Sequence, residues 1–344
     1  MDLNATNRSI EAARQQNNPD QLAEALLVHV NALIEALQLD QAQQALDEAA
    51  NIYCQAGKSD DEAHCHHLMA TIFRLQGHFE EAKSHAMRSR RIVAPNTLTA
   101  LAATIELGEI ALAQGNGLDA TDSFTQAMAQ GTVLNQSTEN RANLLRKRAI
   151  AWVISNHPQN AVQDADTASA LLLQLGESGT ALRVLIEVAT ALQQRKETEA
   201  ANCLQQKAVE VAERANDHSA LADLCLLEAT QAIEQRDIPR AITAARSART
   251  HALEAVAPLP YISAAVAISQ LAETTGNHLA AYEALVVGWA TVSDLLGQEV
   301  ARSMFEPQLL NLRARWGSQL FNEVKLAYEA RRRSECDRYR PCPS

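Results

Sequence analysis

The feature that most constrains the fold of this chain is a repeat of about 40 residues in which alanine recurs at one position. Seven alanines form this column, and successive members are separated by 40, 38, 41, 40, 40 and 40 residues. The column consists of Ala42, Ala82, Ala120, Ala161, Ala201, Ala241 and Ala281. Self-similarity at such a period indicates stacked supersecondary units, so a length of 344 residues does not by itself require two globular domains.

Two further columns of mostly small residues accompany the alanine column at constant offsets. One precedes it by 12 residues and the other follows it by 7. Their members are Val30, Ala70, Gly108, Ala149, Ala189, Ala229 and Ser269, and then Ala49, Ser89, Ala127, Ala168, Ala208, Ala248 and Gly288. Small side chains let two antiparallel helices approach closely, so the columns predict paired helices that cross at these positions.

The segments between the expected helices carry turn signals. The stretches LQGHFEEA, AQGNGLDA, SNHPQNA, EQRDIPRA and TTGNHLAA place Gly, Asn, Asp or Pro where one helix must stop and the next begin. The composition agrees, because only 4% of the residues are aromatic and the chain has 12 glycines and 9 prolines. An almost entirely helical chain is therefore expected.

The clearest unit, LGEIALAQGNGLDATDSFTQAMAQ, runs from Leu107 to Gln130. Its small residues at Gly108, Ala120 and Ala127 resemble the signature of the tetratricopeptide repeat (TPR). The period exceeds the usual value of about 34 residues and is similar to the long-period repeats of kinesin light chains and of bacterial sensor domains. The resemblance, which covers roughly residues 20–297, implies an all-α, right-handed superhelix (solenoid) of about seven helix-turn-helix repeats with a C-terminal capping helix.

The expected organisation has four parts. They are an N-terminal helix or frayed segment (residues 1–19), the repeat superhelix (20–297), capping helices (298–332) and a flexible tail (333–344). In the cap, Pro307 is expected to open a helix and Gly317 to break it. Trp316, Phe321 and Tyr328 follow at helical spacing and are expected to cover the last repeat, with an exposed aromatic binding surface as the alternative.

Charge and motifs exclude several classes of function. A formal net charge of −11 argues against nucleic-acid binding, which needs a basic field. No secretory signal or bilayer-spanning apolar run is evident, so a cytoplasmic protein without membrane contact is expected. No catalytic, phosphate-binding or paired-cysteine motif is present either, and we expect no enzyme activity and no cofactor.

The resemblance also implies which residues line the groove. In TPR proteins the first helix of each pair lies on the concave side, and the family pattern places residues from three repeats there. They are His64, His67 and Arg74, then Asn143, Arg146 and Lys147, then Arg183, Glu187 and Thr190. Arg146, Lys147 and Arg183 form a basic centre suited to a carboxylate or acidic side chain. The alternative is that these cations only balance Glu187 and Glu109 on adjacent helices.

The stretch DEAHCHHLMA, residues 61–70, raises the question of a metal site. In the register that the resemblance implies, His64 and His67 share the groove face, three residues apart on one helix, whereas His66 takes a position where the family has a large core residue and Cys65 lies on another face. The run therefore offers at most a histidine pair, and zinc would need a further ligand such as Glu24 or Glu106. A pH-dependent effect of the pair on partner binding is the other hypothesis.

Three functions follow from these expectations. The leading one is a non-catalytic scaffold or adaptor that holds a peptide or helical segment of another protein in the groove. The second is a sensory module that binds a small ligand or signalling peptide and controls a separate regulator. The third is metal binding through the histidine pair. The partner's identity and the oligomeric state are not set by the sequence.

Overall fold

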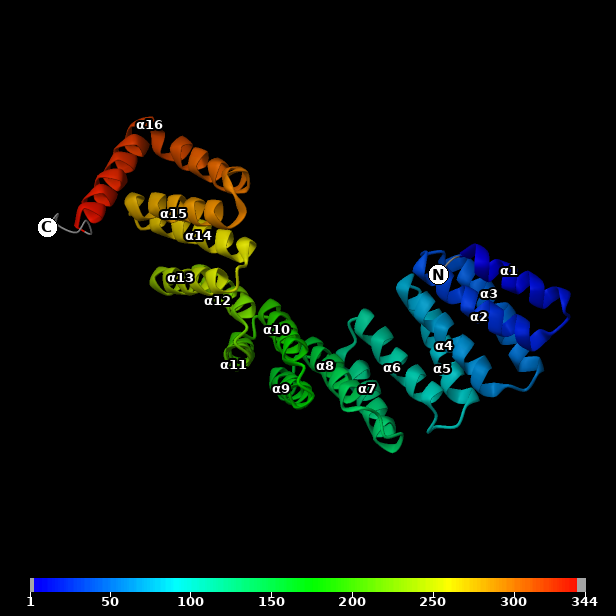
Figure 1. Cartoon of the computed structure of the whole chain (residues 1–344). Helices are drawn as coiled ribbons and strands as arrows, with labels where there is room; N and C mark the ends of the chain where they lie inside the picture. The colour runs from blue at the N-terminus through cyan, green and yellow to red at the C-terminus, as the bar shows by residue number, and fades with distance from the viewer. Residues whose placement is uncertain (1–2, 339–344) are drawn as a thin grey trace. The chain divides into compact units, whose positions relative to one another are not determined.

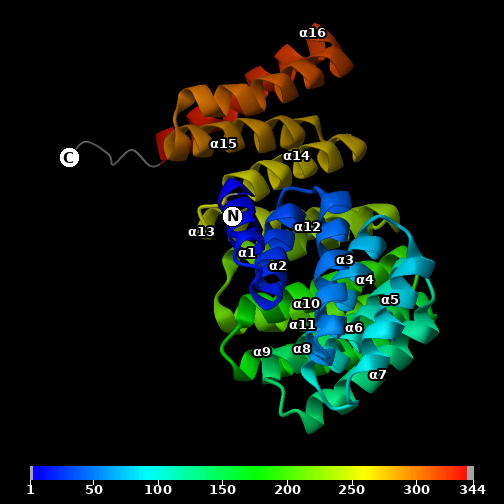
Figure 2. The same cartoon turned by 90° about the vertical axis from the view of Figure 1, so that its right-hand side faces the viewer.

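The computed structural model describes residues 3–338, and within that range every regular element is an α-helix. There are sixteen of them, and consecutive helices pack side by side from α1 to α10 and from α12 to α16 (Figures 1 and 2). Their bounds are α1 Leu3–Gln15, α2 Pro19–Glu35, α3 Leu39–Gln55, α4 Ser59–Leu75, α5 Phe79–Ile92, α6 Leu98–Ala113, α7 Gly117–Val133, α8 Thr138–Ile154, α9 Pro158–Gln174, α10 Ser178–Gln194, α11 Thr198–Ala215, α12 His218–Glu234, α13 Ile238–Glu254, α14 Pro258–Thr274, α15 His278–Leu296 and α16 Gln298–Arg338.

The extra length of the repeat lies inside the helices. Most of them have 17 residues, and three-residue turns such as residues 36–38 and 56–58 join them. The deviations from a 40-residue step come from individual helices and turns of different length. Between Ala82 and Ala120, α5 has only 14 residues and a longer link, residues 93–97, precedes α6 with 16. The spacing of the alanine column thus reports helix and turn lengths directly.

All seven alanines of the column are fully buried, at 0% exposure. The companion columns are buried as well, and their two glycines mark the closest approaches. A Cβ atom on Gly108 would lie 2.5 Å from Cε1 of the buried Phe124, and one on Gly288 would lie 2.7 Å from Cε1 of Phe305. The columns therefore are the lines along which the helices touch, as the sequence predicts.

Helix ends are specified locally. Residues with positive φ recur about every 20 residues, one or two positions after the end of most helices, and they include Gly57, Gly77, Asn135 and Asn156. α5 is an exception, because Val93 after it is extended. At the end of α4, for example, the N–H of His78 donates to the carbonyl oxygen of Phe73 at 2.8 Å. This is the Schellman arrangement, in which a left-handed residue closes the helix and reverses the chain.

The chain divides into two compact units, Met1–Gln206 and Lys207–Ser344, with the division inside α11. In the first unit, the core around α2, α3 and α4 contains Leu33, Leu46 and Met69. In the second unit, Leu285 of α15 packs with Phe305 and Leu312 of α16. α15 is also long and apolar enough to cross a membrane by length and composition, and here it packs against α14 and α16.

The C-terminal segment differs from the expectation at Pro307. α16 begins at Gln298, directly after Gly297 with φ of 92°, so Pro307 lies inside the helix and does not open it. The left-handed glycine ends α15 and resets the chain, which is why the next helix starts there. The expected break at Gly317 is confirmed, because its φ of 78° and ψ of 160° are not helical.

The aromatic residues of α16 pack against the preceding helices. Tyr282 of α15 contacts Phe321 and Tyr328 edge-on, at ring-centroid distances of 5.5 and 5.6 Å. The Trp316 indole N–H donates to Glu273 Oε1 of α14 at 2.7 Å. α16 continues to Arg338, into the segment expected to be a tail, and residues 339–344 lie outside the described residues.

Candidate binding site

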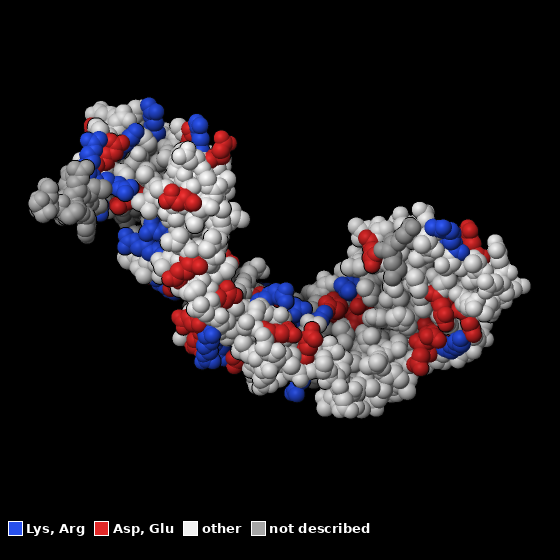
Figure 3. Space-filling view, in the orientation of Figure 1, with Lys and Arg blue, Asp and Glu red and all other residues white. Residues whose placement is uncertain are grey.

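Ion pairs connect the first helices of successive repeats in the first unit. Arg74 of α4 contacts Glu106 of α6 with 2.6 Å between Nε and Oε1. Lys147 of α8 pairs with Glu109 of α6, and Arg146 of α8 pairs with Glu187 of α10 at 2.8 Å. We call the surface that carries these pairs, on α4, α6, α8 and α10, the first-helix face. Figure 3 shows cationic and anionic side chains interspersed on the visible side of the molecule.

These pairs alter the electrostatics expected from the sequence. Two cations of the predicted basic centre, Arg146 and Lys147, each have a carboxylate on the neighbouring helix. Burial lowers the pKa of Lys147, and the nearby charge of Arg74 lowers it further, while Glu106 and Glu187 oppose the shift. The alternative from the sequence, in which the cations balance Glu109 and Glu187, thus describes Arg146 and Lys147.

Arg183 of α10 is different. It is exposed, and its closest polar contact is the Thr180 hydroxyl, one turn earlier, at 3.4 Å from Nη2. Among the described residues no carboxylate lies within ion-pair distance of Arg183. Its guanidinium group therefore keeps donors available for a bound anion.

A pocket of about 360 Å³ lies between α8 and α10. Four of the predicted site residues line it, together with polar and apolar side chains from the two helices and Leu172 of α9. The lining residues are Glu139, Asn140, Ala142, Asn143, Arg146, Leu172, Thr180, Arg183, Val184 and Glu187. The structure thus brings Asn143, Arg146, Arg183 and Glu187 together.

Hydrogen bonds hold the floor of this pocket in place. Arg146 donates to both oxygens of Glu187, at 2.8 and 3.0 Å, and to Asn143 Oδ1 from Nε and Nη2, at 3.3 and 3.1 Å. This fixes the Arg146 guanidinium across the gap between α8 and α10. Thr190, by contrast, uses its hydroxyl to donate to the Ile186 carbonyl within α10 and does not line the pocket.

The histidine run lies on α4, away from this pocket. The rings of His64 and His67 are 6.3 Å apart, and burial lowers the pKa of each. Glu106, one of the two further ligands considered from the sequence beside Glu24, is engaged by Arg74. In the described part of the chain no third donor joins this pair within metal-binding distance. Protonation of the pair therefore falls below the ordinary pH range of imidazole.

His66 occupies the core, as the sequence predicts. It is 5% exposed, and its Nδ1 lies 3.1 Å from Nδ1 of His85 on α5. Burial, Arg88 and His85 lower the pKa of His66 to about 4. Cys65 is fully buried, and burial raises its thiol pKa to about 12. The two residues have packing roles, so they are unsuited to binding an exogenous ion in solution.

One cluster that the sequence reading missed lies in the second unit. His218, His251 and Glu254 bring three potential ligand atoms within 4.8 Å of one another. No short motif marks them, since His218 begins α12 and the other two end α13. The repeat itself supplies the signal that could have found them, because the start of a first helix adjoins the end of its second helix.

No family model matches the sequence, and no curated protein matches it closely enough to indicate relationship. Solved structures do share its fold. BtubC (BKLC) from P. vanneervenii is 15% identical over 62% of this chain and 91% of its own, with a TM-score of 0.53. RapI in its apo form is 10% identical over 78% and 97%, and aspartyl phosphate phosphatase F from Bacillus subtilis is 11% identical over 84% and 75%, each with a TM-score of 0.50.

At these identities the likeness establishes the fold alone. The similar structures are TPR-repeat proteins, and this chain is an all-α solenoid protein built from TPR-like helical repeats. The resemblance drawn from the alanine columns is thereby confirmed.

Proposed function

We propose that this protein is a non-catalytic interaction scaffold that binds an acidic peptide or helical segment of another protein on its first-helix face. The observation that carries the proposal is Arg183, an exposed arginine that has no carboxylate partner among the described residues and lies beside a pocket lined by Arg146 and Asn143. An arginine in this setting offers paired N–H donors to a carboxylate. TPR-like scaffolds use such polar anchors together with the shape of the repeat surface.

The pocket supports an anchor of limited size. Its volume of about 360 Å³ fits one or two side chains or a chain terminus. Asn140 and Asn143 supply amide groups for the backbone of a bound segment, and Val184 and Leu172 supply an apolar wall. Glu139 and Glu187 line the same pocket and repel negative charge there. We therefore expect the pocket to bind peptides whose acidic group lies at one defined position, and to bind polyanions weakly.

The same pocket also supports the second candidate, a sensory module for a small carboxylate ligand that controls a separate regulator. The favouring observation is that cations and carboxylates line one pocket of small-ligand size. A small ligand would stabilise the folded chain by mass action. A scaffold would instead need contacts along several repeats, and so would bind extended segments more tightly than short ones.

The test is peptide selection from a random display library on the full chain, followed by affinity measurement by fluorescence polarisation. Peptides carrying Asp, Glu or a free C-terminal carboxylate at one position should be enriched. Arg183→Glu should lower their affinity by about 10- to 100-fold, because a charge-assisted hydrogen bond is replaced by repulsion. Arg195→Glu provides the matched control, since Arg195 is an exposed arginine directly after the last residue of the same helix α10.

Equal binding by wild type and Arg183→Glu would contradict the proposed anchor. Enrichment of peptides without any acidic group would contradict the ligand class. If no peptide is selected and small carboxylates raise the thermal midpoint of wild type but not of Arg183→Glu, the sensory function replaces the scaffold function.

A further inference from the structure

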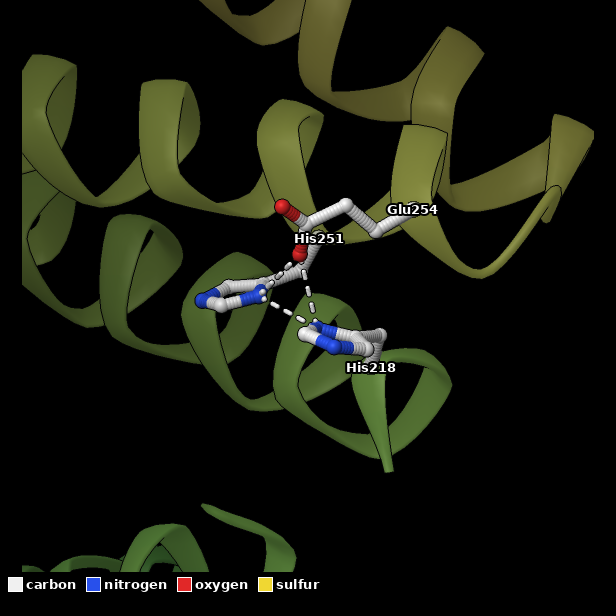
Figure 4. A group of neighbouring side chains, drawn as sticks. All are labelled: His218, His251 and Glu254. Atoms are coloured by element: carbon white, nitrogen blue, oxygen red, sulfur yellow. Dashed lines mark hydrogen bonds and ion pairs between the residues drawn. The ribbon is translucent and has the colours of Figure 1, made fainter. Parts of the chain in front are cut away.

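We propose that His218, His251 and Glu254 form a binding site for a zinc-class divalent cation in the second unit. The site is distinct from the histidine run of α4 and from the first-helix face. It uses two imidazole nitrogens and one carboxylate oxygen, the donor set of many three-ligand zinc sites. Figure 4 shows the two rings side by side with the Glu254 carboxylate directed at them.

The fold brings the three residues together. Asp217 caps α12 by accepting from the Ala220 N–H at 3.0 Å, which makes His218 the first residue of that helix. α13 runs back alongside α12, so its last turn lies beside this start. His251 and Glu254 are three residues apart on α13 and therefore share one of its faces.

The distances suit a shared metal ion. Nδ1 of His218 lies 3.1 Å from Nδ1 of His251 and 2.8 Å from Oε2 of Glu254, and His251 Nδ1 lies 3.6 Å from the same oxygen. Tetrahedral zinc with bonds of 2.0–2.1 Å requires ligand atoms about 3.3 Å apart. The three observed separations lie on either side of this value, so small side-chain rotations complete the site.

Hydrogen bonding among neutral rings does not satisfy all three contacts. Nδ1 of a neutral imidazole carries at most one proton, so His218 can donate it to Glu254 or to His251 but not to both. The two Nδ1 atoms are also close to each other, 3.1 Å apart, and the rings lie nearly parallel with their centroids 5.4 Å apart. A cation at the common centre uses the lone pair of each Nδ1 and the negative charge of the carboxylate together.

The surroundings allow an ion to enter. The side chains of His218, His251 and Glu254 are 28%, 29% and 50% exposed. The rings are thus partly desolvated and held by helix packing, while the carboxylate is free to adjust. Three protein donors leave a fourth position for water, as in open zinc sites. The nitrogen-rich donor set favours zinc-class ions over Mg²⁺ and Ca²⁺, which prefer oxygen ligands.

The test is titration of the full chain with Zn²⁺ in competition with a chromogenic chelator. We expect one tight site per chain, a loss of about 100-fold or more in affinity for His251→Ala and for His218→Ala, and a weaker loss for Glu254→Gln. The matched control is the double variant His64→Ala/His67→Ala, which removes two helical histidines elsewhere. It should bind Zn²⁺ like wild type.

Replacement of Zn²⁺ by Co²⁺ gives a readout independent of affinity. The intense visible absorption of four-coordinate cobalt should appear with wild type and disappear with His251→Ala, while the helical circular dichroism of both stays the same. Glu254→Gln, at an exposed side chain, keeps the test valid if a histidine variant unfolds. Equal Zn²⁺ affinity in wild type and the three site variants, or loss of the site in the His64/His67 control, would overturn the proposal.

Discussion

His66 shows how one residue can carry both a packing role and a pH dependence. Its ring is buried beside His85, and its Nε2 has no hydrogen-bond partner among the described residues. Such a position is occupied at a cost in free energy, since a buried polar atom without a partner is unfavourable. The repeat register, together with the family resemblance, predicts that the side chain faces the core. It does not predict the second histidine across the gap.

We expect folded-state stability to fall between about pH 6.5 and pH 4 because of His66. Its pKa is about 4 in the folded chain and 6.5 when unperturbed, so the unfolded chain binds the proton first as pH falls. Above pH 6.5 His66 is neutral in both states and does not lower the free energy of unfolding. At pH 5 its protonation in the unfolded chain lowers the free energy of unfolding by about 2 kcal/mol. Urea unfolding at pH 7.5 and 5.0 should show that His66→Leu reduces the difference between the two pH values. His157→Leu, at an exposed turn, should leave it unchanged.

At the scale of the element, each helix owes its length to local signals at its two ends. Asn116 caps α7 by accepting from the N–H of Asp119, and Gly115 closes α6 with φ of 74°. After several other helices, the residue with positive φ is one for which the left-handed region is energetically unfavourable, such as Leu37 or Val256. The reversal of the chain at every turn is therefore imposed by packing of the paired helices as well as by turn chemistry.

Val256→Gly should stabilise the second unit by about 1 kcal/mol. Val256 follows α13 with φ of 52° and is 62% exposed, so its β-branched side chain adds strain and contributes little packing. The reciprocal change Gly276→Val, at the equivalent turn after α14 with φ of 72°, should destabilise by a similar amount. Thermal unfolding of the two variants measures both effects. Stability changes of the same sign would show that backbone strain does not dominate at these turns.

At the scale of the whole molecule, the repeat makes stability a sum of neighbour interactions. From α1 to α10 and from α12 to α16, each helix packs mainly on its neighbours in the chain, and pairs such as α4 with α6 add contacts between first helices. A destabilising substitution therefore acts mainly on the neighbouring helices in such an array.

Asp164 of α9 is a position where a substitution should be strongly destabilising, because it accepts two hydrogen bonds from Arg148, at 2.7 and 2.8 Å, and one from Trp152 at 3.1 Å.

Asp164→Ala should lower the free energy of local opening of the α8–α9 hairpin by about 3 kcal/mol, since it leaves the mostly buried Arg148 without its anion. Native-state hydrogen exchange should show faster exchange in α8 and α9 and smaller effects in α7 and α10. Exchange in α2 and α3 should stay at the wild-type rate. Uniform acceleration across residues 3–206 would mean that this unit opens as one cooperative block.

The sequence by itself determined the helical repeat and the helix-crossing lines, and the family resemblance added the core position of His66. The physical reason is that close helix packing demands small residues at fixed intervals, and chain turns demand residues that tolerate positive φ. Both requirements act on individual residues at fixed positions in the sequence, so they can be recognised without knowledge of the tertiary structure. The same rule found the Gly317 break and misjudged Pro307, because Gly297 had already ended the preceding helix.

Only the tertiary structure decided which charges meet. Arg146, Lys147 and Arg183 look alike in the sequence, yet the structure gives carboxylate partners to the first two. Within the described residues, Arg183 has a hydrogen bond to Thr180 and no carboxylate partner. His218 and His251 are 33 residues apart, and they meet because the start of α12 lies beside the last turn of the antiparallel helix α13. Contacts of this kind depend on how neighbouring helices are rotated and shifted relative to each other. The packing of whole helix faces sets this arrangement, and no single column of residues predicts it.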